Sequence, residues 1–306
     1  MHHGIIVIEK EKGFTSHDVV AKLRGILKQK KIGHTGTLDP DATGVLPVCL
    51  GNATKVCDLL TDKDKTYEAV LRLGITTDTQ DISGKIIKEQ MVCVSKDEVW
   101  SSIASFIGEY DQVPPMYSAL KINGKKLYEL AREGKTVERK ARRVRIFDIR
   151  LLEAEEEKGE YRIEVSCSKG TYIRTLCHDI GEKLGCGGVM AELQRTRVGS
   201  FGIEEAVKLS EVEEAVKRGE YSMIRDVDSV FLSYPAGKVK KEAEKWLQNG
   251  NPLKKDQVER IGGVQAGGEE METKNPWIRL YSQDGEFTAI YEVREKEYYP
   301  VKMFFK

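Results

Sequence analysis

The stretch GHTGTLDPDATG, residues 33–44, combines three glycines, a proline, a histidine and two aspartates. Glycine allows positive φ and close backbone approach, and Pro40 stiffens the chain directly after Asp39. The stretch has no apolar period, so we predict that residues 31–44 form a loop between a helix and a buried strand. His34 and Asp39 can both face a ligand from such a loop, and loops held by rigid elements often carry function. The stretch therefore predicts a functional site.

The residues of this loop leave more than one chemical interpretation open. Asp39 can simply accept backbone hydrogen bonds in a Gly/Asp turn. The pattern of a phosphate-binding loop, G-x-x-x-x-G-K-[ST], is absent. Asp39 and Asp41 could act as the carboxylate pair of a carbohydrate hydrolase, but one short loop rarely supplies both sides of a sugar.

The hydrophobic pattern around the loop alternates between strands and helices. We expect strands at residues 4–9, 45–50, 65–74, 143–152 and 161–168, and helices at residues 16–28, 53–60, 95–107, 172–184 and 211–217. Because no regular βαβ rhythm appears, the pattern favours the α+β class.

Residues 234–237, Tyr-Pro-Ala-Gly, are typical of a linker. Beyond them the sequence predicts a short helix at 242–248 and strands at 277–281, 287–293 and 299–304. We therefore expect a catalytic domain of residues 1–234 and a small β-rich domain of residues 235–306, a size at the low end for domains.

Composition indicates a globular cytoplasmic protein without a membrane anchor. The chain has 306 residues, with 49 basic and 49 acidic side chains. Its six cysteines form no C-x-x-C pair, and its N-terminus does not resemble a signal peptide. The charge is unevenly distributed, because residues 121–145 hold ten basic and three acidic side chains, and residues 22–31 hold five basic and none acidic. These stretches favour an RNA-binding surface.

Five motifs in order resemble the TruB-type tRNA pseudouridine synthases. The motifs are GHTGTLDPDATGVLPVCLGNATK (33–55), KTYEAVLRLGITTDTQDISG (65–84), PPMYSALKINGKKLYELAREG (114–134), SCSKGTYIRTLCHDIGEKLG (166–185) and LQRTRVGSF (193–201). The resemblance implies a mixed, largely antiparallel central sheet. The segment after Tyr234 resembles the family less closely than the body does, and it could be either a divergent PUA-like RNA-binding module or a small stabilising β domain. The resemblance also implies isomerisation of uridine to pseudouridine, typically at uridine 55 of the tRNA T loop. One departure is Glu11 after Lys10, where the family often has proline.

The same resemblance implies a catalytic set. Asp39 is the carboxylate, Arg174 its ion-pair partner, and Tyr67 the ring that stacks on the flipped base, with a hydroxyl that could help remove the C5 proton. His34 would occupy the space left by the extruded nucleotide, and Leu193 would form an apolar wall.

We predict the RNA-binding residues from the basic side chains and consider the remaining histidines separately. We expect RNA contacts from a set of cations, namely Lys10, Lys121, Lys125, Arg142 and Arg143, with Arg195 and Arg197 behind them. His17 and His178 are interpreted as structural. The T-arm of tRNA is the expected partner, and the chain is expected to act as a monomer without metal or cofactor. The alternative is an RNA chaperone that binds and refolds tRNA without catalysis.

Overall fold

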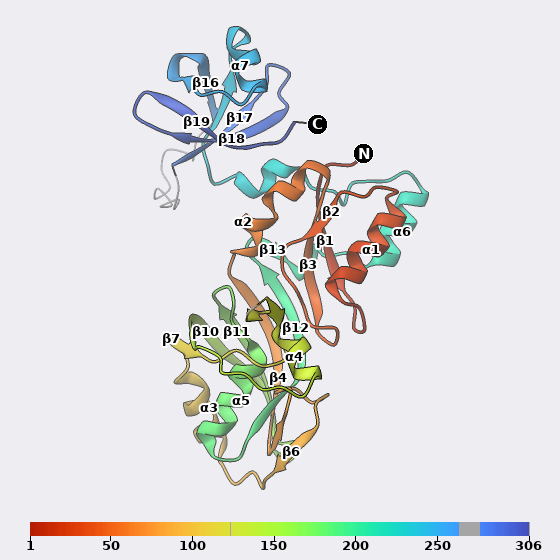
Figure 1. The fold of residues 1–306 in the computed structure, drawn as a ribbon, viewed down its shortest axis with the longest axis vertical. Helices are drawn as coiled ribbons and strands as arrows, with labels where there is room; N and C mark the ends of the chain where they lie inside the picture. The colour runs from red at the N-terminus through yellow and green to blue at the C-terminus, as the bar shows by residue number, and fades with distance from the viewer. Residues whose placement is uncertain (123, 263–275, 306) are drawn as a thin grey trace.

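A computed structural model describes residues 1–122, 124–262 and 276–305, and its strands form two main sheets (Figure 1). Within these residues the larger sheet has nine strands in the order β1-β3-β12-β4-β11-β10-β7, with β2 paired to β3 and β13 to β12. The strands are β1 (Gly4–Lys10), β2 (Ile32–His34), β3 (Thr43–Leu50), β4 (Lys65–Leu73), β7 (Gly108–Gln112), β10 (Arg142–Glu155), β11 (Glu160–Cys167), β12 (Gly188–Val198) and β13 (Phe201–Gly202). Only the β12–β3 pairing is parallel among them. The expected mixed, largely antiparallel sheet is confirmed.

Helices pack on this sheet through apolar stripes. The helices are α1 (Ser16–Ile26), α2 (Cys57–Thr61), α3 (Lys96–Ala104), α4 (Leu127–Arg132), α5 (Ile173–Leu184) and α6 (Leu209–Lys217). The α3 helix begins with the Ser95/Glu98 capping box that the sequence suggests, and α5 ends at Gly185 with φ of 74°. Apolar residues of α3 and α5 share one buried cluster with β4 and β11, whereas α1 and α6 bury residues with β1 and β3. The sheet therefore has two separately covered halves.

The β12 strand joins these halves, and sequence periodicity did not predict it. It pairs with β4 over most of its length and with β3 through Gln194 and Arg195 (Figure 1). Its C-terminal half, LQRTRV, lacks an apolar alternation, because a central strand beside a cleft carries polar side chains. The predicted loop at 31–44 also needs a correction, since residues 32–34 form β2 against β3.

A smaller β-rich unit follows. Its six described strands are β14 (Ala236–Val239), β15 (Leu253–Lys254), β16 (Val258–Gly262), β17 (Trp277–Tyr281), β18 (Phe287–Val293) and β19 (Glu297–Met303), with α7 (Glu244–Gln248) beside them. The expected linker at 234–237 is partly wrong, because Ala236 and Gly237 already pair in β14. Phe304 and Ile290 pack in one cluster with Ile5 and Val7, so this unit is fastened to the N-terminal half of the large sheet.

The other described segments are small. They comprise the hairpin of β5 (Ile75–Thr77) with β6 (Ile86–Glu89) and that of β8 (Lys121–Ile122) with β9 (Lys125–Lys126). Within the described ranges, none of the helices reaches the length and hydropathy of a membrane-spanning segment.

Candidate active site

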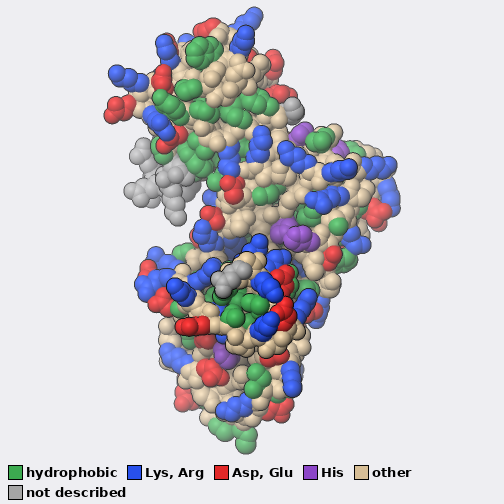
Figure 2. Space-filling view, in the orientation of Figure 1, with side chains coloured by type: hydrophobic (Ala, Val, Ile, Leu, Met, Phe, Trp, Pro, Cys, Tyr) green, Lys and Arg blue, Asp and Glu red, His purple; other side chains and the backbone are tan. Residues whose placement is uncertain are grey.

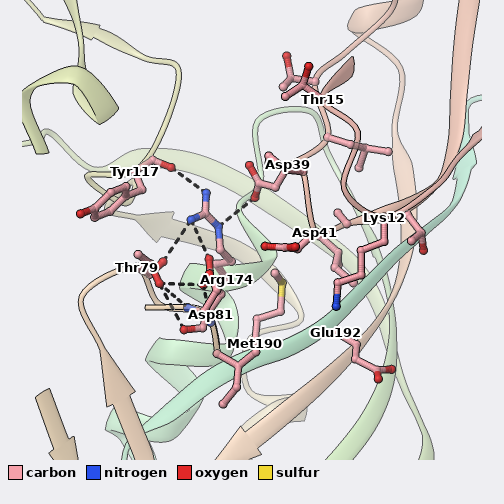
Figure 3. Close-up of a pocket in the computed structure, with 18 of the residues that line it drawn as sticks. Lys12, Thr15, Asp39, Asp41, Thr79, Asp81, Tyr117, Arg174, Met190 and Glu192 are labelled. Atoms are coloured by element: carbon pink, nitrogen blue, oxygen red, sulfur yellow. Dashed lines mark hydrogen bonds and ion pairs between the residues drawn. The ribbon is translucent and has the colours of Figure 1, made fainter. Parts of the chain in front are cut away.

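A cleft of about 970 Å³ opens where the two halves of the large sheet meet, and the 33–44 loop forms one wall (Figure 3). The opposite walls come from the 79–83 loop, the segment before and within α4, and β12. Its lining includes Asp39, Asp41, Thr79, Asp81, Tyr117, Lys126, Arg132, Arg162, Arg174, Met190 and Leu193. Sequence segments that are far apart therefore contribute to one cavity.

Buried contacts fix the backbone of the 33–44 loop. Leu38 is 4% exposed, and its N–H donates to the Ser16 hydroxyl over 2.9 Å. The Pro40 carbonyl accepts from the Gly13 N–H at 2.9 Å and from Lys10 Nζ at 3.0 Å. Because its neighbours on both sides are held in this way, Asp39 extends from a rigid support into the cleft.

Arg174 is the buried cation of the site. Its Nε lies 3.1 Å from Asp39 Oδ2, and its side chain is 7% exposed whereas that of Asp39 is 45% exposed. It also donates to Asp81 Oδ2 at 3.2 Å, to the Thr79 carbonyl at 3.2 Å and to the Tyr117 carbonyl at 2.8 Å (Figure 3). Arg174 thus lies between two carboxylates, and its planar guanidinium is oriented by both.

The charge balance around Asp39 favours a reactive carboxylate. Burial raises the pKa of Asp39 above its ordinary value, Arg174 lowers it in opposition, and Asp81 adds a smaller upward contribution. A carboxylate whose pKa is raised is more basic than an exposed one, while the nearby guanidinium favours its charged form. The arginine expected from the sequence therefore offsets only part of the desolvation.

Tyr67 lies beneath this site in the core. It is 8% exposed and shares a buried cluster with Leu38 and Ala42 of the loop. Burial raises the pKa of the Tyr67 hydroxyl, and Arg195 and Asp39 are among the groups that act on it. Tyr67 is not among the described residues that line the cleft. Its stacking on a base stays a prediction.

The two histidines of the loop region lie together. The His34 and His17 rings meet edge to face at 5.2 Å, and burial lowers the pKa of His34. His17 is exposed and lines the cleft, so the structural interpretation of His17 needs correction. His178 lies on α5 and is half-buried.

Two basic residues expected on the RNA surface are buried instead. Lys10 is fully buried, and its Nζ donates to the carbonyls of Glu11, Phe14 and Pro40, which uses its three hydrogens. Burial lowers the pKa of Lys10 to about 8. Arg195 is 1% exposed. The expectation of RNA contact is wrong for both, because neither cation reaches the surface.

Other predicted RNA-binding residues do lie on the surface, at some distance in sequence from the loop. Lys121, Lys125 and Arg142 are exposed, whereas exposed Arg143 pairs with Glu109 at 3.1 Å and with Asp111 at 2.8 Å. Figure 2 shows Lys and Arg side chains gathered around α4 and the middle of the molecule, where His side chains also reach the surface.

Some of the cleft residues were not singled out from the sequence. Arg162 lines the cavity and was not predicted, whereas Lys126 and Arg132 belong to the predicted basic stretch 121–145, and Leu193 was predicted as the apolar wall. Asp81 was not assigned a role from the sequence, although it belongs to the DTQDISG end of the second motif. An acidic residue in a motif beside a predicted strand end could have drawn attention to it. No group of three or more His, Cys, Asp or Glu suited to a metal occurs in the part of the chain described.

Comparison with solved structures defines the class of this fold. A chain from the crystal structure of a Cbf5-Nop10-Gar1 complex superposes with a TM-score of 0.72 at 27% identity, covering 99% of this chain and 85% of that chain. A chain from an H/ACA RNP bound to a substrate RNA containing 2'-deoxyuridine gives 0.71 at 25% identity, covering 99% and 86%. The fold is that of the Cbf5/TruB-type pseudouridine synthases.

Sequence comparison then gives the family. Residues 24–173 match the TruB family pseudouridylate synthase N-terminal domain, and residues 174–231 match the tRNA pseudouridylate synthase B C-terminal domain. A protein of Lachnoclostridium phytofermentans named tRNA pseudouridine synthase B is 55% identical over 99% of both chains. Another of that name, from Alkaliphilus oremlandii, is 50% identical over 82% of this chain and 83% of its own. The chain belongs to the TruB family of pseudouridylate synthases.

Proposed function

We propose that this enzyme isomerises uridine to pseudouridine in tRNA, at uridine 55 of the T loop, with Asp39 as the catalytic carboxylate. The observation that carries the proposal is the 3.1 Å contact between Asp39 and the buried Arg174 at the cleft. The relatives named tRNA pseudouridine synthase B support the tRNA substrate. The choice of uridine 55 rests on the resemblance of the motifs.

The reaction explains why a carboxylate is needed at this place. The bond between uracil N1 and ribose C1′ must break, the base must turn, and C5 must bond to C1′. Asp39 either attacks the sugar or takes a proton from it so that a glycal forms. In both routes the carboxylate must be ionised and directed, and Arg174 supplies both conditions.

The other residues act on the base and on the space it leaves. Tyr67 stacks on the uracil, and its hydroxyl removes the C5 proton in the last step. Leu193 closes the apolar side of the pocket, which its place in the cleft lining supports. His34, the last residue of β2 and part of the 33–44 stretch, fills the gap in the RNA from which the nucleotide is extruded.

Binding must offset the free energy of base flipping, which is about a few kcal/mol. The exposed cations around α4, Lys121, Lys125 and Arg142 among them, would contact phosphates of the T-arm. Such binding weakens steeply as salt rises. The β-rich unit after residue 234 would form a PUA-like RNA-binding domain, with the boundary at 234/235, and the enzyme would act as a monomer.

The test is release of tritium from C5-labelled uridine in an unmodified tRNA transcript. Wild-type enzyme should release one tritium per modified site, and Asp39→Asn and Asp39→Ala should lose release while still binding the transcript. A transcript with uridine 55 replaced by cytidine should release nothing from that site. Full activity in Asp39→Ala would refute the mechanism, and an inactive wild type that still binds tRNA would favour the chaperone function.

A further inference from the structure

Arg195 is the largest of the fully buried side chains in the described part of the chain. Its Nε donates to the Val45 carbonyl at 2.8 Å, but its Nη2 has no hydrogen-bond partner among the described residues. Burying a charged group without a full set of partners is unfavourable by several kcal/mol or more. The position of Arg195 therefore needs an explanation beyond packing.

Among the described residues, no acidic side chain acts on Arg195 as a counter-ion. Within the described ranges, the ion pairs with Asp39 and Asp81 are made by Arg174 and not by Arg195. Its charge instead lowers the pKa values of Lys10, Lys65 and His34, all of which are basic groups. After burial, which lowers the pKa of Arg195, the largest influence on it is Tyr67, which stabilises the cation.

The sheet explains why these two side chains meet. Arg195 on β12 and Tyr67 on β4 are direct partners in an antiparallel ladder, so their side chains leave the sheet on the same face. Directly opposite residues have Cβ atoms about 5 Å apart. Arg195 also passes behind the catalytic loop, because a Cβ built on Gly36 would lie 3.8 Å from its Nη1. One guanidinium thus lies between the Tyr67 ring and the loop that carries Asp39.

We propose that Arg195 is a positioning residue for catalysis, which holds and polarises the Tyr67 hydroxyl for removal of the C5 proton. The inference rests on the proposed function and deepens it. In the last step the C5 hydrogen leaves as a proton to the Tyr67 oxygen, and the C–H electron pair forms the C5–C6 double bond. The electrons of the N1–C6 double bond move to N1, which takes a proton from solvent. Tyr67 must first have given its own proton to solvent, which balances the proton that N1 later takes, so a stabilised phenolate favours the step.

The electrostatics agree with this role. Burial raises the pKa of the Tyr67 hydroxyl, which opposes its action as a base, and Arg195 is the strongest group that lowers it again. Cys167 and Asp39, the other side chains that act on Tyr67, both raise its pKa. Without the guanidinium, the phenolate would be harder to form.

Arg195 also lies against the loop that carries Asp39, so its loss could slow the reaction only by disturbing that loop. Such a purely structural role predicts a different isotope effect. The test therefore uses tRNA with deuterium or protium at C5 of the target uridine, in single-turnover reactions. Arg195→Met should slow product formation about 10- to 100-fold and raise the C5 isotope effect above that of wild type, because C–H cleavage becomes slower than the earlier steps. A loop brace alone would slow bond cleavage to C1′ and leave the isotope effect unchanged or smaller.

Arg197→Met is the matched control on the same strand. Arg197 is exposed and hydrogen-bonds Thr66 at 3.2 Å, so weaker tRNA binding there would change KM and leave the isotope effect at the wild-type value. An Arg195→Met enzyme with the wild-type isotope effect would overturn the proposal. A wild-type enzyme that releases no C5 tritium would instead overturn the proposed function.

Arg195→Lys keeps the proposal testable if the methionine variant does not fold. Buried Lys10 and Lys65 nearby both have pKa values of about 8, so a lysine at 195 should lose its proton in the same range. The titratable groups that interact with this position are Tyr67, Lys65, Lys10 and His34, and Cys167 and Asp39 act in turn on Tyr67. The rate of C5–H cleavage in this variant should therefore fall as pH rises above about 8. The pH profile of the wild type should lack this alkaline limb. Identical pH profiles would overturn the proposal.

Discussion

Replacing Arg174 with methionine tests the contact on which the proposed mechanism depends. Methionine fills the volume of the buried stem but removes the charge that faces Asp39 and Asp81. Burial already raises the pKa of Asp39, and Arg174 is the main group that opposes the rise. The variant should therefore need a higher pH to ionise Asp39.

The size of the change follows from the distance. Two unit charges 3.1 Å apart attract by about 1.3 kcal/mol in water and by about 5 kcal/mol at the effective dielectric constant of ~20 used near protein surfaces. Since the Asp39 side chain is 45% exposed, solvent screening favours the lower part of this range. We therefore expect the ionised form of Asp39 to lose about 1–3 kcal/mol of stabilisation in the variant, which raises its pKa further.

The assay is the pH dependence of C5 tritium release in single turnover. Activity depends on the ionised carboxylate, so it is present above the pKa of Asp39 and is lost as pH falls through it. In Arg174→Met this acidic limb should move to higher pH, because the carboxylate has lost its cation, and the maximal rate should also be lower. Arg174→Lys should move it less, because a cation remains.

Arg150→Met provides the control. Arg150 pairs with Glu164 and Asp148 but is 63% exposed, outside the cleft lining, so its loss should leave the limb unmoved. If the limb of Arg174→Met coincided with that of wild type, Arg174 would not control the ionisation of Asp39, and the electrostatic argument would be wrong.

Three further predictions follow from particular side chains and backbone positions. Gly44→Ala should lower the free energy of unfolding in urea by about 2–3 kcal/mol, because Gly44 has φ of +101° and an added Cβ would lie 2.2 Å from the Arg195 carbonyl oxygen. Gly108→Ala has a similar φ of +112° but open space, so a destabilisation as large as that of Gly44→Ala would refute the clash. Lys126→Ala and Arg132→Ala should each reduce the slope of log Kd for tRNA against log salt by about 0.7–0.9 for each phosphate that is no longer neutralised. Arg143→Ala should reduce the slope less, because two acids already pair with Arg143. Equal slopes for the three variants in filter binding would contradict this prediction. Asn52→Ala should lower the melting temperature by an amount equivalent to about 1–2 kcal/mol. The reason is that the Asn52 amide donates a hydrogen bond to the Phe304 carbonyl, and this bond joins the β-rich unit to the large sheet. An unchanged melting curve would show that the bond contributes nothing.

Most of the fold could be expected from local patterns, with the β12 strand as the main exception. Buried strands such as β1 and capped helices such as α3 follow from apolar periodicity and terminal side chains, which are local properties. The β12 strand does not, because its polar C-terminal half is stabilised by partners on β3 and β4 that are distant in sequence. Apolar periodicity does not predict a strand whose residues line a cleft as well as pack in the core.

The candidate site also contains features that local sequence predicts and features that depend on the tertiary structure. The pairing of Asp39 with Arg174 was expected from motif resemblance, and the two groups do lie together. The second carboxylate, Asp81, and the burial of Lys10 and Arg195 were missed, since exposure depends on what the whole chain packs around a side chain.

Local sequence is enough to predict the α+β class, the family and the loop that carries Asp39. Those features are encoded by short runs of residues whose chemistry can be interpreted one segment at a time. Which cations meet solvent and which are enclosed depends instead on the packing of the complete chain, because desolvation is a property of everything that surrounds a side chain. The sequence shows Lys10 and Arg195 as positive charges, and the fold makes them internal supports of the cleft.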